Sequence, residues 1–173
     1  MAFSPSIERA SSSGPSCQNL RSQVMNLQAS APPNVVPIAT PVSAEKTTQL
    51  ESVRLGSDGL TITMSSEHWE ATISFPQNYG FRVLDELDLT EFWSQCSLAR
   101  GWCFEVISGG WKDLEMTRKH FYSGRHAWVR EYLVVGLNEC VSVLSKEEPV
   151  FEVQVPSSLS FKRTPAGTAQ VKR

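Results

Sequence analysis

The chain contains three histidines and four cysteines, the residue types that most often act as general bases, nucleophiles or metal ligands. No histidine belongs to an HExxH or HxxxH motif, and no cysteine belongs to a CxxC pair. Cys103 and Cys140 fall in expected strands, where packing in the core is the usual role of a free cysteine. The sequence therefore predicts no catalytic cysteine, no metal and no cofactor.

The stretch around residues 111–126 has a catalytic interpretation. It is the least regular part of the tryptophan-rich region, and it holds His120 and His126 together with Asp113 and Glu115. A histidine beside a carboxylate can transfer protons in a general acid–base mechanism. A small enzyme that uses these groups is one of our hypotheses.

Asp85, Glu86, Asp88 and Glu91 form the densest acidic cluster in the sequence. Such a cluster can dock a basic partner, and two of its carboxylates could also act as acid and base. The structural interpretation is a helix N-terminus, where the macrodipole stabilises carboxylates. Because Asp88 and Glu91 have the spacing of a capping box, we expect the helix to begin at Asp88.

The string Ser108-Gly109-Gly110-Trp111 follows an expected strand. Two glycines permit a positive φ and a close backbone approach, and their N–H groups could hold an anion. The string matches neither the phosphate-loop pattern nor the GxGxxG pattern, so it does not indicate a nucleotide. We expect a structural turn that places Trp111 on the core.

The five tryptophans are many for a region of this size. We expect a core set made of Trp69, Trp93 and Trp102. Trp111 and Trp128 flank loops and are expected to be partly exposed. With Arg125 and Arg130 close in sequence, exposed indoles form a candidate binding hot spot. The candidate partner-binding residues are thus Asp85, Glu86, Asp88, Glu91, Trp111 and Trp128.

Alternation of apolar and polar residues predicts seven strands. They cover residues 60–65, 69–75, 81–84, 102–107, 129–135, 140–144 and 150–155. The short links between them favour an antiparallel meander. Leu89, Phe92, Trp93 and Cys96 have helical spacing and would cover one face of the sheet. The predicted fold class is α+β, a mainly antiparallel sheet of about six to seven strands with one short helix packed on it.

The composition changes near residue 58. Residues 1–57 are rich in Ser, Pro, Ala and Gln, whereas all five tryptophans lie in residues 59–156. A chain orders itself only where buried apolar area offsets the lost conformational entropy. We therefore expect a disordered leader at residues 1–57, a single domain at residues 58–156 and a disordered basic tail at residues 157–173.

Charge is unevenly distributed along the chain. Residues 59–156 hold 8 basic and 14 acidic residues, whereas residues 157–173 hold 4 basic residues and none that are acidic. An acidic body repels phosphate, so nucleic acid is an unlikely partner and a basic protein fits better. Stacking of nucleobases on the exposed aromatics is disfavoured for the same reason.

The sequence also bears on the compartment. Cys17 lies in the leader, which leaves an odd number of cysteines in the domain and favours a reducing, cytoplasmic location. The sequence holds no apolar run long enough for a membrane span, and its start lacks the apolar region of a secretory signal. The serine-rich, acid-poor leader resembles in composition a type III secretion leader, so export is the alternative.

Several segments carry a resemblance to a known group of proteins. They are FRVLDE at residues 81–86, FW at 92–93, GW at 101–102, SGGW at 108–111 and EYLVVG at 131–136. Through them, residues 60–155 resemble small uncharacterised bacterial proteins, some of which are similar to immunity proteins of polymorphic toxin systems. The resemblance implies a protein that binds a toxin, and it identifies no catalytic residue.

The leading hypothesis is a non-enzymatic module, immunity-like or antitoxin-like, that docks a basic protein through an acidic face. The acidic domain and the lack of a catalytic motif in the sequence favour it. The alternatives are an exported effector with a secretion leader and the small enzyme described above.

Overall fold

The computed structural model describes residues 32–154 of the chain. The described strands are β1 (Asn34–Pro37), β2 (Gln49–Gly56), β3 (Gly59–Ser65), β4 (Glu70–Phe75), β5 (Asn78–Asp85), β6 (Cys103–Ser108), β7 (Arg130–Val135), β8 (Glu139–Ser145) and β9 (Val150–Gln154). The helices are the 3₁₀ helices η1 (Glu86–Phe92) and η2 (Ser123–Arg125) and the α-helix α2 (Trp111–Met116). Within the described part of the chain, no helix is long and apolar enough to cross a membrane.

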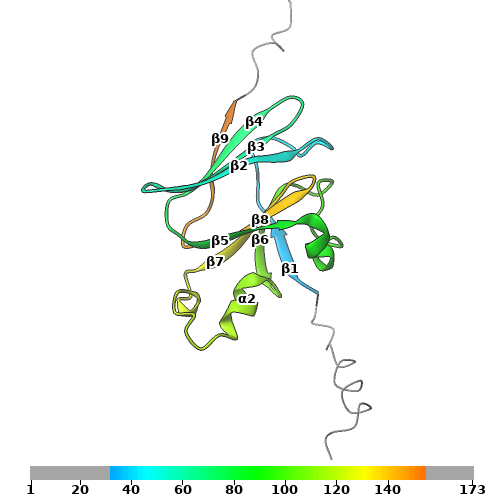
Figure 1. The fold of residues 1–173 in the computed structure, drawn as a ribbon. Coiled ribbons are helices and arrows are strands. Elements are labelled where there is room, and N and C mark those ends of the chain that lie inside the picture. The colour runs from blue at the N-terminus through cyan, green and yellow to red at the C-terminus, as the bar shows by residue number, and fades with distance from the viewer. Residues whose placement is uncertain (1–31, 155–173) are drawn as a thin grey trace, which may run out of the picture. The chain divides into compact units, whose positions relative to one another are not determined.

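The strands form two antiparallel sheets that pack face to face (Figure 1). The five-stranded sheet has the order β1-β6-β7-β8-β5, and the four-stranded sheet has the order β2-β3-β4-β9. Every described strand pair is antiparallel. The chain changes sheet between β1 and β2, between β4 and β5, and between β8 and β9, and so builds a sandwich around one core.

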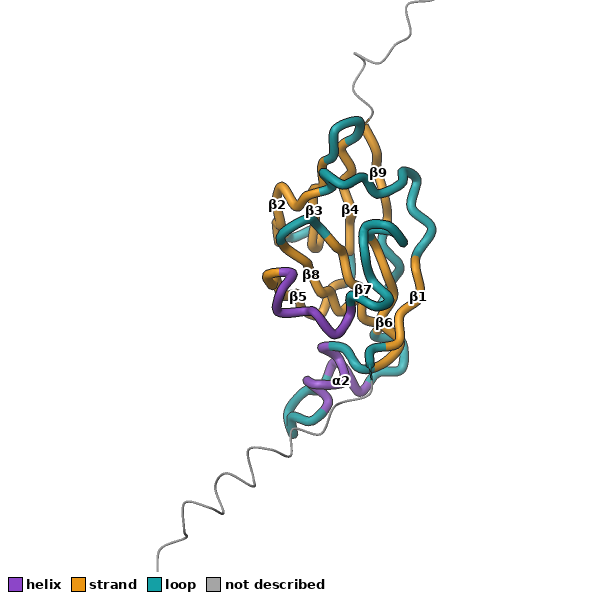
Figure 2. Tube along the Cα trace, turned by 90° about the vertical axis from the view of Figure 1, so that its right-hand side faces the viewer, coloured by secondary structure: helices purple, strands orange, loops and turns teal. Residues whose placement is uncertain are grey.

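The main core lies between the two sheets (Figure 2). Strand β3 contributes Leu60, Ile62 and Met64 to it, and strand β7 contributes Tyr132 and Val134. All five side chains are buried. They are alternate residues of their strands, which is how a pleated strand presents one side to a core.

Two indoles hold the long connection between β1 and β2 onto this core. Trp69 stacks on Trp102 with ring centroids 5.3 Å apart. The indole N–H of Trp69 donates to the carbonyl of Ser43 at 3.0 Å, and that of Trp102 donates to the carbonyl of Val42 at 2.9 Å. Buried indoles need a polar partner, and here the connection supplies it.

The structure corrects the domain boundary expected at residue 58. Strands β1 and β2 both precede that residue, and each pairs with a strand from the predicted domain. Residues 34–37 and 49–56 of the predicted disordered leader are therefore part of the fold. Residues 1–31 of that leader and the predicted basic tail at 157–173 lie outside the described residues.

The predicted mainly antiparallel α+β class is confirmed, but the single-sheet meander is wrong. Strand β5 pairs with β8 and not with its sequence neighbour β4, and β9 pairs with β4 and not with β8. Pro76 and Gln77 separate β4 from β5 and let the chain pass from one sheet to the other. The seven predicted strands correspond to β3–β9, and β1 and β2 complete nine in the described residues.

Candidate partner-binding face

We call the side of the five-stranded sheet that points away from the four-stranded sheet the outer face. Alternation along β6 and β7 places Phe104 and Leu133 on the outer face, whereas Cys103 and Tyr132 point into the main core. Helices η1 and α2 both cover this face, η1 towards one end and α2 with the loop that follows it towards the other (Figure 1). All six candidate partner-binding residues belong to these two regions or to the segments that flank them.

Helix η1 begins directly after strand β5. Asp85 is its N-cap, and a side-chain oxygen of Asp85 accepts the backbone N–H of Leu87 at 2.8 Å. Asp88, which the sequence predicted as the cap, instead lies inside the first turn. The carboxylate of an N-cap satisfies a helix N–H that has no partner within the helix, so Asp85 has a structural role.

The remaining carboxylates of the acidic cluster surround η1. Asp85, Asp88 and Glu91 are exposed, and Glu86 is half-buried. Among the described residues, no cation lies within ion-pair distance of these four carboxylates. The cluster therefore presents negative charge that no described side chain pairs at close range.

A pocket of about 370 Å³ lies beside η1, between the helix and the outer face. Its walls are apolar and come from both sides, chiefly Leu89, Phe92, Cys96, Leu98, Leu133 and Val135. Glu86, Trp93 and Leu137 also line it. Trp93 and Leu137 are 47% and 43% exposed, so large apolar side chains surround the opening. A pocket of this size and lining suits a small apolar group or a partner's side chain.

The sequence predicted Trp93 in the core, but the structure shows it exposed. Helical spacing placed it with Leu89 and Phe92, but only these two residues of η1 are buried. Leu89 has non-helical backbone angles, φ −125° and ψ 27°, which interrupt the helix. The 3.6-residue period therefore fails, and the indole turns towards solvent.

The two thiols that line the pocket are poor nucleophiles. Burial raises the pKa of Cys96 to about 12 and that of Cys140 to about 11. Cys103, buried in the main core, has its pKa raised to about 12 for the same reason. A nucleophilic cysteine needs a lowered pKa, so these residues pack as small apolar groups, as the sequence predicted.

Helix α2 is attached to the outer face by a buried carboxylate. Glu131 of strand β7 is 1% exposed, and its oxygens accept the backbone N–H of Trp111 at 2.9 Å and of Lys112 at 2.6 Å. Burial raises the pKa of Glu131, while these two hydrogen bonds and the charge of Arg82 oppose the rise. The sequence suggested that backbone N–H groups at the SGGW string could hold an anion. In the structure the N–H groups of Trp111 and Lys112 hold the carboxylate of Glu131.

The glycines of the SGGW string are explained by this contact. A Cβ on Gly110 would lie 2.6 Å and 2.7 Å from the two Glu131 oxygens and 2.6 Å from Cγ1 of Val106. Gly109 has φ 76°, and its N–H donates to a carboxylate oxygen of Asp113 at 2.6 Å. The first glycine makes the turn and the second allows the close approach.

Trp111 is half-buried against Arg82 of strand β5. The Arg82 guanidinium carbon lies 5.3 Å from the centre of the indole ring, within the range of a cation–π contact. The indole N–H donates to Glu115 at 3.0 Å. Trp111 is thus partly exposed, as predicted, but its ring lies against Arg82 and belongs to neither core cluster.

Trp128 lies in the loop between α2 and β7 and is 51% exposed. The ring of His126 stacks on the indole of Trp128, with 4.4 Å between the ring centroids and an interplanar angle of 9°. The indole N–H of Trp128 donates to Tyr79 Oη at 3.3 Å. Tyr122 in the same loop lies under Arg125, with 5.2 Å between the guanidinium carbon and the ring centre. This region presents aromatic rings and positive charge together.

The histidine–carboxylate pairs of the enzyme hypothesis do not form. Asp113 accepts from Gly109, and Glu115 accepts from Trp111 and Arg118. His120 instead lies within hydrogen-bond distance of the hydroxyl of Tyr122, at 3.4 Å. Within residues 32–154, no group of three or more His, Cys, Asp or Glu side chains could hold a metal ion.

The structure thus separates the predicted site residues into two groups. Asp85, Glu86, Asp88 and Glu91 lie together around η1, whereas Trp111 and Trp128 lie at the other end of the outer face. Sequence reasoning missed the pocket and the buried Glu131. For Glu131 a signal existed, since it is the one acidic residue in the strand REYLVV. Comparisons of the chain with protein-family models, curated proteins and solved structures found no match.

Proposed function

We propose that the chain is a non-enzymatic binding module that docks a basic protein through η1 and the pocket beside it. The observation that carries the proposal is the combination of an apolar pocket of about 370 Å³ with carboxylates that have no close cation among the described residues. Aromatic and aliphatic anchors that enter a pocket supply most of the affinity of an interface. Charges around the pocket add orientation and rate of association.

The partner that fits this surface carries one large apolar side chain flanked by Lys or Arg. The apolar side chain would enter the pocket past Trp93 and Leu137, whose exposed surface would be covered in the complex. The cationic side chains would meet Asp88 and Glu91. An immunity-like protein that neutralises a basic toxin would bind in this way.

The titratable groups of the pocket favour binding over catalysis. The thiols of Cys96 and Cys140 have raised pKa values and stay protonated near neutral pH. Glu86 lines the pocket, and no histidine, lysine or arginine among the described residues forms an ion pair with it. A catalytic site usually pairs such groups so that their pKa values diverge.

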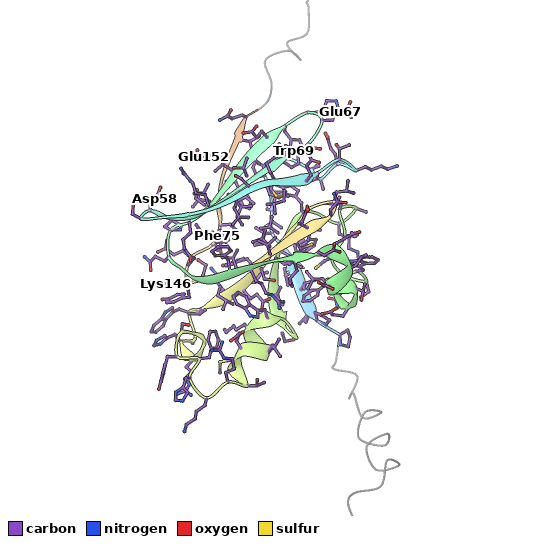
Figure 3. The ribbon with its side chains drawn as sticks, in the orientation of Figure 1. Asp58, Glu67, Trp69, Phe75, Lys146 and Glu152 are labelled. Atoms are coloured by element: carbon purple, nitrogen blue, oxygen red, sulfur yellow. The ribbon has the colours of Figure 1, made fainter. Side chains whose placement is uncertain are left out.

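The test is a comparison of captured proteins between the tagged full-length chain and two charge variants. The site variant is Glu86→Gln, Asp88→Asn and Glu91→Gln. The matched control is Glu67→Gln, Glu70→Gln and Glu152→Gln, which removes the same charge from exposed positions near and on the four-stranded sheet. Figure 3 labels Glu67 and Glu152. We expect one basic protein bound by the wild type and the control and lost in the site variant.

The salt dependence of capture gives a second criterion. Binding through unscreened surface charge should weaken when the ionic strength rises, because the Debye length shortens. Equal capture by the site variant and the wild type would contradict the proposal. A Trp93→Ala variant that retains full affinity would contradict the role given to the pocket.

A further inference from the structure

The outer face carries opposite charges at its two ends. The acidic end comprises Asp85, Glu86, Asp88 and Glu91 around η1, and residues 85–99 contain no basic residue. The basic end is the loop after α2 together with the first residue of β7, and residues 117–130 contain four basic residues and none that are acidic. Figure 1 places η1 and this loop on opposite sides of α2.

Two cations of the basic end lack a close anionic partner. Arg118 pairs with Glu115, and Arg130 pairs with Glu105 and Glu148. Lys119 and Arg125 are exposed, and neither pairs with a carboxylate in the described part of the chain. Like the carboxylates at the acidic end, these two cations have no close partner of opposite charge among the described residues.

Both ends also expose large apolar side chains. Leu87 and Trp93 at the acidic end are 63% and 47% exposed. Tyr122 and Trp128 at the basic end are 63% and 51% exposed. Exposed aromatic side chains are enriched at protein interfaces, where charged residues lie mostly at the rim. The basic end therefore has the composition that the pocket's partner should have.

A face with opposite charges at its two ends is complementary to a second copy of itself. A two-fold axis that lies in the plane of contact, across the middle of the face, brings the acidic end of each copy onto the basic end of the other. Both contacts then form at once and the assembly closes. Between the ends lies Arg82, which is half-buried and near the charges of Glu91, Glu115 and Glu131. The middle of the face is thus not a site of strong self-repulsion.

We propose that two copies of the chain associate as a two-fold symmetric dimer through their outer faces, with the acidic end of each copy against the basic end of the other. This inference rests on the proposed function, since the basic surface that docks at η1 is here the basic end of a second copy. Tyr122 or Trp128 of one copy covers the pocket of the other. A separate basic protein would compete with the second copy for the same surface.

The experiment measures the mass of the full chain by sedimentation velocity over a range of concentrations and salt. One variant reverses the acidic end, Asp88→Lys with Glu91→Lys, and the other reverses the basic end, Lys119→Glu with Arg125→Glu. All four positions are exposed, so the variants should fold, which far-ultraviolet circular dichroism checks. We expect a wild-type dimer and an increase of about tenfold or more in the dissociation constant of each variant alone.

An equimolar mixture of the two variants is the decisive sample. In a mixed pair both contacts are again between opposite charges, so we expect dimers to return in the mixture. A wild type that stays monomeric overturns the inference, as does a dimer that neither variant weakens, which would indicate pairing of sheet edges. Oligomers that keep growing with concentration also overturn it, because a two-fold pair closes.

These outcomes separate the inference from the proposed function. A monomeric wild type that still captures a basic protein through η1 overturns self-association alone. A dimer restored in the mixture, together with capture that is indifferent to the η1 charges, supports self-association and removes the separate protein partner.

Discussion

The buried carboxylate of Glu131 accepts the backbone N–H of Trp111 at 2.9 Å and so ties the first turn of α2 to strand β7. The same carboxylate accepts from Lys112 at 2.6 Å. Because α2 leads into the loop with Tyr122 and Trp128, this contact determines where the aromatic and basic residues stand relative to η1. A structural carboxylate in the sheet therefore sets the layout of the outer face.

The substitution Gly110→Ala should destabilise the fold by about 1–3 kcal/mol, the usual range for overpacking. The new Cβ would lie 2.6 Å from both a Glu131 oxygen and the Val106 side chain. Urea unfolding followed by tryptophan fluorescence measures the change. As a control, Gly56→Ala meets only the side chain of Asp58 and should change stability by less than about 0.5 kcal/mol. Equal effects of the two substitutions would contradict the packing argument.

The free energy of unfolding of the wild type, measured relative to that of the Glu131→Gln variant, should fall as the pH rises. Burial raises the pKa of Glu131 above its ordinary value of 4.5, so the folded state binds the proton more tightly than the unfolded state. The stability from this group is complete below the unfolded pKa and is lost as the pH rises through the folded pKa. Urea midpoints of both proteins between about pH 4 and pH 8 test this. A difference that grows with pH would mean that the N–H bonds outweigh desolvation.

Tyr132→Phe should leave stability unchanged or raise it by up to about 1 kcal/mol. Tyr132 is fully buried, and among the described residues its hydroxyl has no hydrogen-bond partner. Removing the hydroxyl removes a desolvated polar group and keeps the ring that packs on Phe75 at 5.6 Å. Thermal or urea unfolding decides the point. A loss greater than about 1 kcal/mol would show that the hydroxyl is hydrogen-bonded in solution.

The cysteines of the described fold should not react with a thiol reagent while the protein is native. The pKa of Cys96 and Cys103 is raised to about 12 and that of Cys140 to about 11, so almost no thiolate exists near neutral pH. Ellman's reagent applied to a Cys17→Ser variant should detect no thiol until urea exposes three. Rapid native reaction of Cys96 or Cys140 would mean that the pocket activates a thiol.

The strands with a buried side could be predicted because their pattern is local. In β3, Leu60, Ile62 and Met64 alternate with threonines, and each is buried. Strand β2 could not be found in this way, because a register shift between Leu50 and Ser52 breaks its alternation and leaves its half-buried residues, Leu50 and Val53, three positions apart. The sheet changes depend on pairings across long separations, such as Arg82 with Ser142, which no local pattern encodes.

In the candidate site too, the features made by neighbouring residues could be predicted and those made by distant segments could not. The acidic cluster is contiguous in sequence, so its presence on η1 followed from local reasoning. The pocket combines Leu89 of η1 with Leu133 of β7, and the contact of Glu131 with Trp111 spans 20 residues. Such features arise only when tertiary packing brings distant segments together.

The most direct test of docking at η1 is amide hydrogen exchange of the full chain, free and bound to its captured basic protein. Docking at η1 predicts slower exchange at residues 85–98 and 136–140, which form η1 and the pocket. The strands of the four-stranded sheet should exchange as they do in the free chain. Protection confined to the four-stranded sheet, with η1 and the pocket unchanged, would contradict the account.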